Sequence, residues 1–193
     1  MKAREAILQS IRAAGTPELP LPSVVPPTAQ TRASLPDRFI EMLHLAGGGS
    51  RLLEYRQQYT EFLNLDFPEA RQIVFCTVDS AAGSPPPEIP SLVHQPPDLV
   101  VLEASIGVAE NGAVWLDDRD LPRRVLPFIA ENVLILLHVD GLVADMHAAY
   151  SAIGRTDYSF GLFLSGPSKT ADIEQSLVIG AQGAKSLRVY LHR

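Results

Sequence analysis

Residues 158–193 read YSFGLFLSGPSKTADIEQSLVIGAQGAKSLRVYLHR and decide the fold class. An apolar run at 160–164 ends in a polar loop at 165–170, and a second apolar run follows at 187–191. The residues between them repeat apolar side chains every four positions, as on one face of a helix: Ile173, Leu177 and Ala181. The pattern predicts a strand, a helix and a parallel strand. Because such a crossover is right-handed, we expect the loop at the carboxyl edge of the sheet, where open α/β sheets bind ligands.

The loop at 165–170 combines hydroxyl groups with one cation. Backbone N–H groups at a helix start have no intrahelical partners, and the helix dipole favours an anion there. The loop is therefore a candidate anion or phosphate site, formed by Ser165, Gly166, Ser168, Lys169 and Thr170. A structural alternative remains, in which Thr170 only caps the helix while Asp172 and Glu174 already complement its dipole.

The ten residues from Ser165, SGPSKTADIE, followed by Gly180 and Gly183, resemble the C-terminal signature of the lactate-utilisation protein C family, also called the LUD domain. The likeness extends over about residues 40–193. It implies the three-layer Rossmann-like fold, with a mostly parallel sheet and helices on both faces, that glucosamine-phosphate deaminase, ribose-phosphate isomerase and CoA-transferases share. Where the family usually has His-Gly, this chain has Gln182 before Gly183.

A second informative stretch, SIGVAENGAVWL at 105–116, contains Asn111-Gly112 between two β-like runs, which predicts a tight hairpin. The hairpin alone is a sufficient structural reading. The segment from Ala109 to Gly112 also matches an Ala-Glu-x-Gly segment of the protein C family. It is similar to the Glu-Asn-Gly of class I CoA-transferases, whose Glu is the acyl-accepting nucleophile. This resemblance makes Glu110 a candidate nucleophile or base, with Asn111 and Gly112 as ligand contacts.

Two further stretches contribute candidates. The segment RRVLP at 123–127 matches an Arg-then-Leu-Pro segment of the family, so the resemblance makes Arg124 an anion or partner contact, with a surface salt bridge as the alternative. The apolar run 133–139 reads as a central strand, and His138 near its end either faces the ligand edge or is a satisfied core residue. The five histidines lack His-x3-His or His-Glu-x2-His spacing, so we expect no metal site.

The remaining pattern sets the domain organisation. Strands expected near residues 51, 73, 99, 114, 134, 161 and 188 alternate with helices over about 3–14, 37–46, 57–65 and 142–153. Prolines crowd residues 16–36. We therefore expect an N-terminal helix and Pro-rich arm over 1–36, followed by a single α/β domain over 37–193. Exchange of the arm between subunits would form a homo-oligomer.

Composition limits the partners and the chemistry. Sixteen Lys and Arg against 22 Asp and Glu give a net charge of −6, which argues against broad nucleic-acid or anionic-membrane binding. The single cysteine, Cys76, excludes an internal disulfide and a cysteine-held iron–sulfur cluster within the chain. No apolar run is long enough to span a membrane and the N-terminus lacks an apolar signal core, so the sequence predicts a cytoplasmic protein without membrane insertion.

Two function hypotheses follow. The resemblance implies an accessory component of L-lactate oxidation to pyruvate, which carries no cofactor itself and acts with iron–sulfur partner proteins. The alternative is a small-molecule enzyme of the CoA-transferase and cyclo-ligase-like superfamily. It would bind a phosphate or carboxylate ligand at the loop 165–170, with Glu110 as base or nucleophile.

Overall fold

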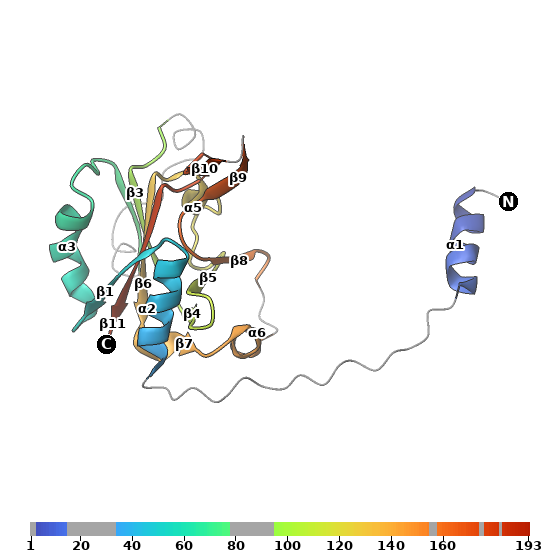
Figure 1. The fold of residues 1–193 in the computed structure, drawn as a ribbon, viewed down its shortest axis with the longest axis horizontal. Helices are drawn as coiled ribbons and strands as arrows, with labels where there is room; N and C mark the ends of the chain where they lie inside the picture. Colours follow the sequence, from blue (N-terminus) through green and yellow to red (C-terminus); the bar gives the residue numbers. More distant parts are fainter. Residues whose placement is uncertain (1–2, 15–33, 78–94, 155–157, 174–175, 182) are drawn as a thin grey trace.

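The computed structural model describes residues 3–14, 34–77, 95–154, 158–173, 176–181 and 183–193, with the backbone alone over 171–173 and 176–177. The expected N-terminal helix is present as α1 (Ala3–Ala13), which buries none of its residues and is drawn apart from the other elements in Figure 1. Most of the predicted Pro-rich arm lies outside the described residues. Among the described helices, none is long and apolar enough to cross a membrane.

A parallel sheet forms the centre of the molecule (Figure 1). In the order β1-β11-β6-β3-β2, every neighbouring pair is parallel. The strands are β1 (Gly49–Leu53), β2 (Ile73–Cys76), β3 (Leu99–Ala104), β6 (Asn132–His138) and β11 (Ser186–His192). The sequences of β3 and β6 are almost continuously apolar and their side chains are buried on both faces, as expected for central parallel strands. The predicted α/β class with a mostly parallel sheet is confirmed.

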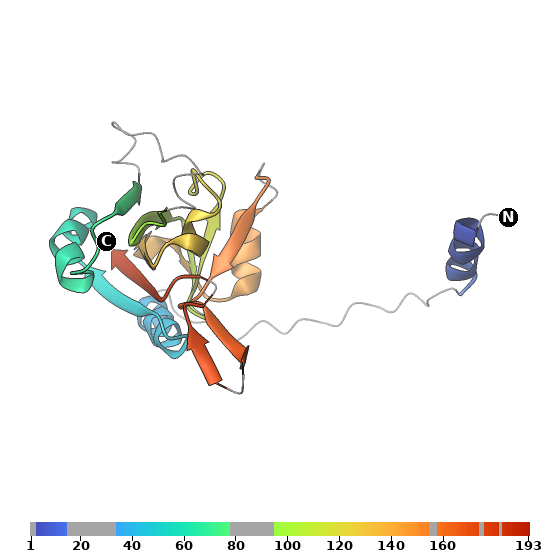
Figure 2. The ribbon, with the colours of Figure 1, turned by 90° about the horizontal axis from the view of Figure 1, so that it is seen from above.

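Different layers cover the two faces of this sheet (Figures 1 and 2). One face carries helix α2 (Leu35–Leu45) and a second sheet, of order β7-β4-β5-β8. The other face carries helix α3 (Tyr59–Asp66), preceded by the 3-10 turn η2 (Arg56–Gln58). The second sheet contains β4 (Ile106–Val108), β5 (Ala113–Asp117), β7 (Leu142–Val143) and β8 (Gly161–Leu164). Antiparallel pairing of β4 with β5 confirms the hairpin predicted at Asn111-Gly112.

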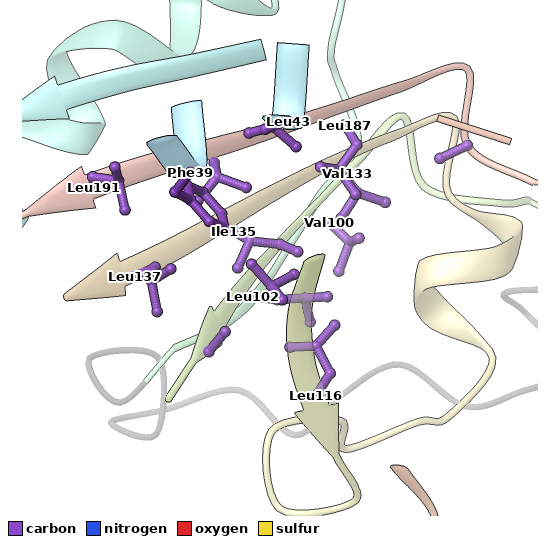
Figure 3. Close-up of a cluster of buried hydrophobic side chains, with 14 of the residues drawn as sticks. Phe39, Leu43, Val100, Leu102, Leu116, Val133, Ile135, Leu137, Leu187 and Leu191 are labelled. Atoms are coloured by element: carbon purple, nitrogen blue, oxygen red, sulfur yellow. The ribbon is translucent and has the colours of Figure 1, made fainter. Parts of the chain in front are cut away.

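Successive side chains of a strand point to opposite faces of the sheet, so the central strands divide the core into two clusters, one on each face. The larger cluster lies between the central sheet, α2 and the second sheet, and includes Phe39, Leu102, Leu116 and Ile135 (Figure 3). The smaller cluster lies between the sheet and α3, and contains Tyr59, Leu63, Leu99, Val101, Leu134, Leu136 and Tyr190. We call the side facing α3 the α3 face.

The remaining elements are short. They are α5 (Leu126–Ile129), η4 (Val139–Gly141), α6 (Met146–Ile153), β9 (Lys169–Ile173) and β10 (Ser176–Ile179). The helix expected over 142–153 starts late, because residues 142–143 instead pair with β4 as β7. Helix α6 is capped by Asp145, whose Oδ1 accepts a hydrogen bond of 2.8 Å from Ala148 N–H.

The predicted strand-helix-strand unit near the carboxyl end is wrong in two respects. The residues expected to form its helix instead form an antiparallel hairpin of β9 and β10. Strand β8 pairs antiparallel with β5 in the second sheet and does not join the central sheet. The β-branched residues Val178 and Ile179 favour a strand over a helix, and Phe163 of β8 packs against the Trp115 ring of β5.

The expected position of the loop 165–170 is also wrong. Ser168 N–H donates a hydrogen bond of 2.9 Å to the carbonyl of Ala184, which lies just before β11 begins. Gly166 lies against Ala46, which lies just before β1. The loop is therefore beside the amino ends of the central strands, not at their carboxyl edge.

Candidate functional site

The loop 165–170, which we call the elbow, contacts the hairpin turn 109–112 directly. Ser165 Oγ donates a hydrogen bond of 3.0 Å to the carbonyl oxygen of Asn111. In the turn, Asn111 Oδ1 accepts a bond of 3.0 Å from Ala113 N–H, which fixes the tight conformation. The two stretches that the sequence singled out are thus brought together, although 54 positions separate Ser165 from Asn111.

Two glycines let the turn and the elbow approach α2 closely. A Cβ on Gly112 would lie 2.6 Å from Leu43 Cα and 2.8 Å from the carbonyl carbon of Met42. A Cβ on Gly166 would lie 3.0 Å from the carbonyl carbon of Ala46. Both glycines have positive φ, +67° and +70°, which side-chain-bearing residues adopt only at a cost. Gly112 and Gly166 therefore serve backbone packing.

The elbow does not form the helix-start cradle that the sequence predicted. Thr170 lies in β9, so it does not cap a helix, and the described residues that follow it form the strands of a hairpin instead of a helix start with unpaired N–H groups. The N–H of Ser168 is occupied by Ala184, and its carbonyl accepts from Gly180 N–H at 2.9 Å. The exposed Lys169 places its ammonium near the carboxyl end of α2, 3.2 Å from a Cβ built on Gly47, where the helix dipole favours a cation.

Glu110, the predicted nucleophile or base, is exposed at the hairpin turn. Its Oε2 accepts a hydrogen bond of 3.0 Å from Met146 N–H, the first residue of α6. A carboxylate stabilises such a helix start, both as an acceptor and through the dipole. Glu110 therefore links the turn to α6, and one of its carboxylate oxygens is occupied in that role.

Arg124 lies away from the elbow. It forms an ion pair of 3.1 Å with Asp118 and also donates to Ser159 Oγ. These partners lie near the end of the β5–β8 ladder where Asp117 pairs with Gly161, whereas the elbow follows Leu164 at the other end. Three residue steps along a strand span about 10 Å. The structure thus separates Arg124 from the other candidates and gives it the surface salt bridge of the alternative reading.

A different set of polar residues meets at the carboxyl edge of the central sheet. Four residues, which we call the edge cluster, come from η2 and the ends of three neighbouring strands: Arg56, Glu103, His138 and His192. Arg56 and Glu103 form a bidentate ion pair, with Nε to Oε1 at 3.1 Å and Nη2 to Oε2 at 3.0 Å. The pair joins η2, which follows β1, to β3, and β11 and β6 lie between those strands.

Two imidazoles belong to β6 and β11, the strands that lie between β1 and β3. His138 and His192 are direct neighbours in the β6–β11 register, and their rings pack edge to face with centroids 5.1 Å apart. His138 Nδ1 accepts a bond of 3.1 Å from Asp140 N–H. His192 is only 7% exposed, and its Nδ1 is buried without a hydrogen-bond partner among the described residues. Burial lowers the pKa of His192, and this effect outweighs a hydrogen bond with the backbone of Arg193, which raises it.

Of this cluster, sequence reasoning found only His138. Arg56 and Glu103 are 47 positions apart, and no local motif marks either one. The residues that alternate along a strand, and so share one face of the sheet, carry a signal that could have been read from the sequence. Two apolar columns each end in a polar residue: Leu99, Val101, Glu103 in β3 and Leu134, Leu136, His138 in β6. The neighbouring column of β11 gives no such signal, because it reads Arg188, Tyr190, His192.

No cluster of three or more metal-ligating side chains occurs within the part of the chain that the structure describes. The expectation that iron–sulfur clusters belong to partner proteins stays a prediction.

Comparisons with known proteins give a consistent result for the fold. The model of the LUD domain family matches residues 97–192, from the start of β3 to the end of β11. A crystal structure of a DUF162 family protein from Deinococcus radiodurans superposes with a TM-score of 0.64, at 19% identity over 86% of this chain and 100% of that chain. At that identity the likeness supports the fold alone. No curated protein matches the chain.

Proposed function

Because the chain belongs to the LUD-domain family, which is linked to lactate utilisation, we propose that it is an accessory component of L-lactate oxidation to pyruvate. In this proposal it acts with iron–sulfur proteins that accept the electrons. The family match over residues 97–192 is the observation that carries the proposal.

The cysteine content supports an accessory role. The chain has one cysteine, whereas a cysteine-held iron–sulfur cluster needs several thiolates. Cys76 is partly buried in β2, and burial raises its pKa to about 11. The thiol therefore stays protonated at neutral pH, so it is a poor ligand and a poor nucleophile. In this proposal, the iron–sulfur partner proteins therefore carry the electrons from lactate.

A reconstitution tests this proposal. Iron–sulfur proteins encoded beside this chain would be purified and mixed with L-lactate and an artificial electron acceptor, with and without the chain. We expect the complete mixture to form pyruvate and reduce the acceptor, and the rate to fall at least about tenfold without the chain. Unchanged activity without the chain would contradict the accessory role. Oxidation of lactate by the chain alone would contradict the absence of its own redox chemistry.

A small-molecule enzyme acting at the elbow is the second candidate. The Ser165–Asn111 hydrogen bond supports it, because the bond brings the exposed Lys169 and Glu110 segments into one surface region. The chemistry of this region suits a phosphorylated or carboxylate substrate, with Glu110 as base or nucleophile.

Ligand-induced stabilisation separates this candidate from a pure adaptor. Lactate, inorganic phosphate, nucleotides and CoA would be screened by thermal unfolding, where a ligand at 100 times its Kd stabilises by about 2.7 kcal/mol. The enzyme reading expects such a gain with one of them, lost in Lys169→Ala. It also expects turnover lost in Glu110→Gln, which keeps an acceptor for Met146 N–H, and not in the exposed control Glu54→Gln. No gain with any probe would argue against a substrate site at the elbow.

A further inference from the structure

Helix α1 presents apolar side chains and two cations on one side. Residues three or four positions apart share a side of a helix, so one side of α1 carries a set that we call the α1 stripe: Arg4, Ile7, Leu8, Ile11 and Arg12. Ile7 is 60% exposed and Ile11 is 65% exposed, and no residue of α1 is buried. Neither arginine forms an ion pair with a described residue. The α1 stripe is therefore unpartnered within the described part of the chain.

A helix as short as α1 needs a partner. In water, an isolated helix of fewer than about 12 residues is marginally stable, so most of its stability must come from packing of its apolar side. The views in Figures 1 and 2 both place α1 apart from the other elements. The spacing of the α1 stripe is that of helices that bind an apolar surface of another protein. Its partner therefore lies outside the chain that carries it.

The two arginines indicate the chemistry of that partner. Arg4 and Arg12 lie one helical turn before and one turn after Leu8, so their Cα atoms are about 12 Å apart. A lipid surface suits this arrangement poorly, because Arg4 lies between Ile7 and Leu8 around the helix axis and would be carried toward the acyl chains. A protein surface with a carboxylate on each side of an apolar residue would pair with both guanidinium groups.

The outer side of α3 has this chemistry. Leu65 is 68% exposed, and the half-buried Phe62 lies one turn before it on the same side of the helix. Glu61 also lies one turn before Leu65, and Glu69 lies in the turn that follows α3. Both glutamates are exposed, and neither forms an ion pair with a described residue. We call these four residues the α3 patch.

The arginines near the α3 patch are engaged by other carboxylates. Arg51 Nη2 lies 2.9 Å from Asp66 Oδ1, and Arg188 Nη1 lies 3.8 Å from Oδ2 of the same residue. Arg71 donates its backbone N–H to Asp98 at 2.7 Å, and its side-chain charge also acts on that carboxylate. The two glutamates of the α3 patch have no such partner, so they are available to cations from another molecule.

We propose that α1 of one copy of the chain binds the α3 patch of a second copy. The two segments have the same four-residue spacing around a central leucine, with opposite charges: Arg4, Leu8, Arg12 and Glu61, Leu65, Glu69. Each copy gives one α1 and receives one, so the contact occurs twice and closes a dimer with two-fold symmetry. The segment 15–33 spans at most about 65 Å, which is enough to reach a neighbouring copy. This inference does not rest on the proposed function.

Sedimentation velocity of the full-length protein, from about 1 to 100 μM, tests the proposal. We expect a monomer–dimer equilibrium in which Leu8→Gln and Leu65→Gln each raise the dimer Kd at least about tenfold. Neither leucine is buried, so both variants should keep the unfolding temperature that the wild-type monomer has at low concentration. The matched control is Ala13→Gln, which lies on the opposite side of α1 and should dimerise like the wild type.

Charge exchange tests the pairing of the two segments. Reversal of α1 by Arg4→Glu with Arg12→Glu should raise the dimer Kd at least about tenfold. Addition of Glu61→Arg with Glu69→Arg to the same chain should restore dimerisation, because the opposite charges face each other again.

A second pair of substitutions controls for net charge. Glu41→Arg with Glu54→Arg, at exposed sites outside the α3 patch, restores the net charge of the reversed α1 variant and should not restore its dimer.

Four outcomes would overturn the inference. They are a monomer at every concentration, a dimer that Leu8→Gln or Leu65→Gln leaves unchanged, equal rescue by the control pair, and a monomer that binds anionic lipid vesicles through Leu8. Dimerisation as expected together with a failed reconstitution of lactate oxidation would overturn only the accessory role.

Discussion

Replacement of Gly112 by alanine tests how the hairpin turn is held against α2. The new Cβ would lie 2.6 Å from Leu43 Cα, about 1 Å inside the usual carbon–carbon contact. The obstacle is helix backbone, which cannot rotate away as a side chain can. Overpacking of this kind costs about 1–3 kcal/mol, and an alanine at the positive φ of +67° costs about 1–2 kcal/mol more. We therefore expect Gly112→Ala to lower the free energy of unfolding by about 3 kcal/mol.

The matched control is Gly47→Ala, which measures the cost of an alanine at positive φ without the clash against helix backbone. Gly47 also has positive φ, +85°, but its new Cβ would meet the flexible end of Lys169, with Nζ at 3.2 Å, and would make an ordinary contact of 3.5 Å with Pro167 Cδ. It should lose about 1 kcal/mol. Equilibrium urea unfolding at pH 7 measures both, and with a slope of about 2 kcal/mol/M the midpoints should fall by about 1.5 M and 0.5 M. Equal losses in the two variants would refute close packing of the turn on α2.

Two further predictions concern partly buried carboxylates. Burial raises the pKa of Asp120 to about 6 from 3.8, so its stabilising contribution is present at low pH and is lost as pH rises through 6. Asp120→Asn, which keeps an acceptor for Asp117 N–H, should stabilise the protein by about 1–2 kcal/mol at pH 7, since solvent screens the partly exposed group, and little at pH 4, as measured by urea unfolding at both pH values. Tyr190→Phe removes the hydroxyl that donates to the carboxylate of Asp66, and should cost about 2 kcal/mol by chemical denaturation. The exposed control Tyr55→Phe should change the stability by less than about 0.5 kcal/mol, and equal effects would count against the Asp66 network.

The strands of the central sheet could be predicted from the sequence, because burial on both faces requires a continuous run of apolar residues. The runs of β3 and β6 are apolar on both faces, which only a covered strand tolerates, and the Asn111-Gly112 pair marks a hairpin by its own backbone preference.

The hairpin of β9 and β10 was misread because a spacing of four is compatible with more than one structure. Ile173, Leu177 and Ala181 would share a helix face, but the β-branched Val178 and Ile179 favour extended backbone. That error moved the elbow to the wrong edge of the sheet. The position of β8 depends on pairing with β5, which local pattern does not reveal.

Local sequence pattern also fails to show which residues of the candidate site come together in space. Glu110 and Ser165 were found as motifs, and their contact through Asn111 appears only in the fold. The edge cluster depends on strand order, which brings Arg56 across two strands to Glu103, so no sequence window contains it.

Growth on L-lactate tests the central claim most directly, namely that this LUD-domain chain serves lactate oxidation without thiol or cluster chemistry of its own. A strain lacking the gene would be supplied with the wild-type chain or with Cys76→Ser, which replaces the one thiol by a near-isosteric hydroxyl. We predict that deletion abolishes growth on L-lactate and that both chains restore it equally. Normal growth of the deletion strain, or failure of a folded Cys76→Ser chain to restore growth, would contradict the account.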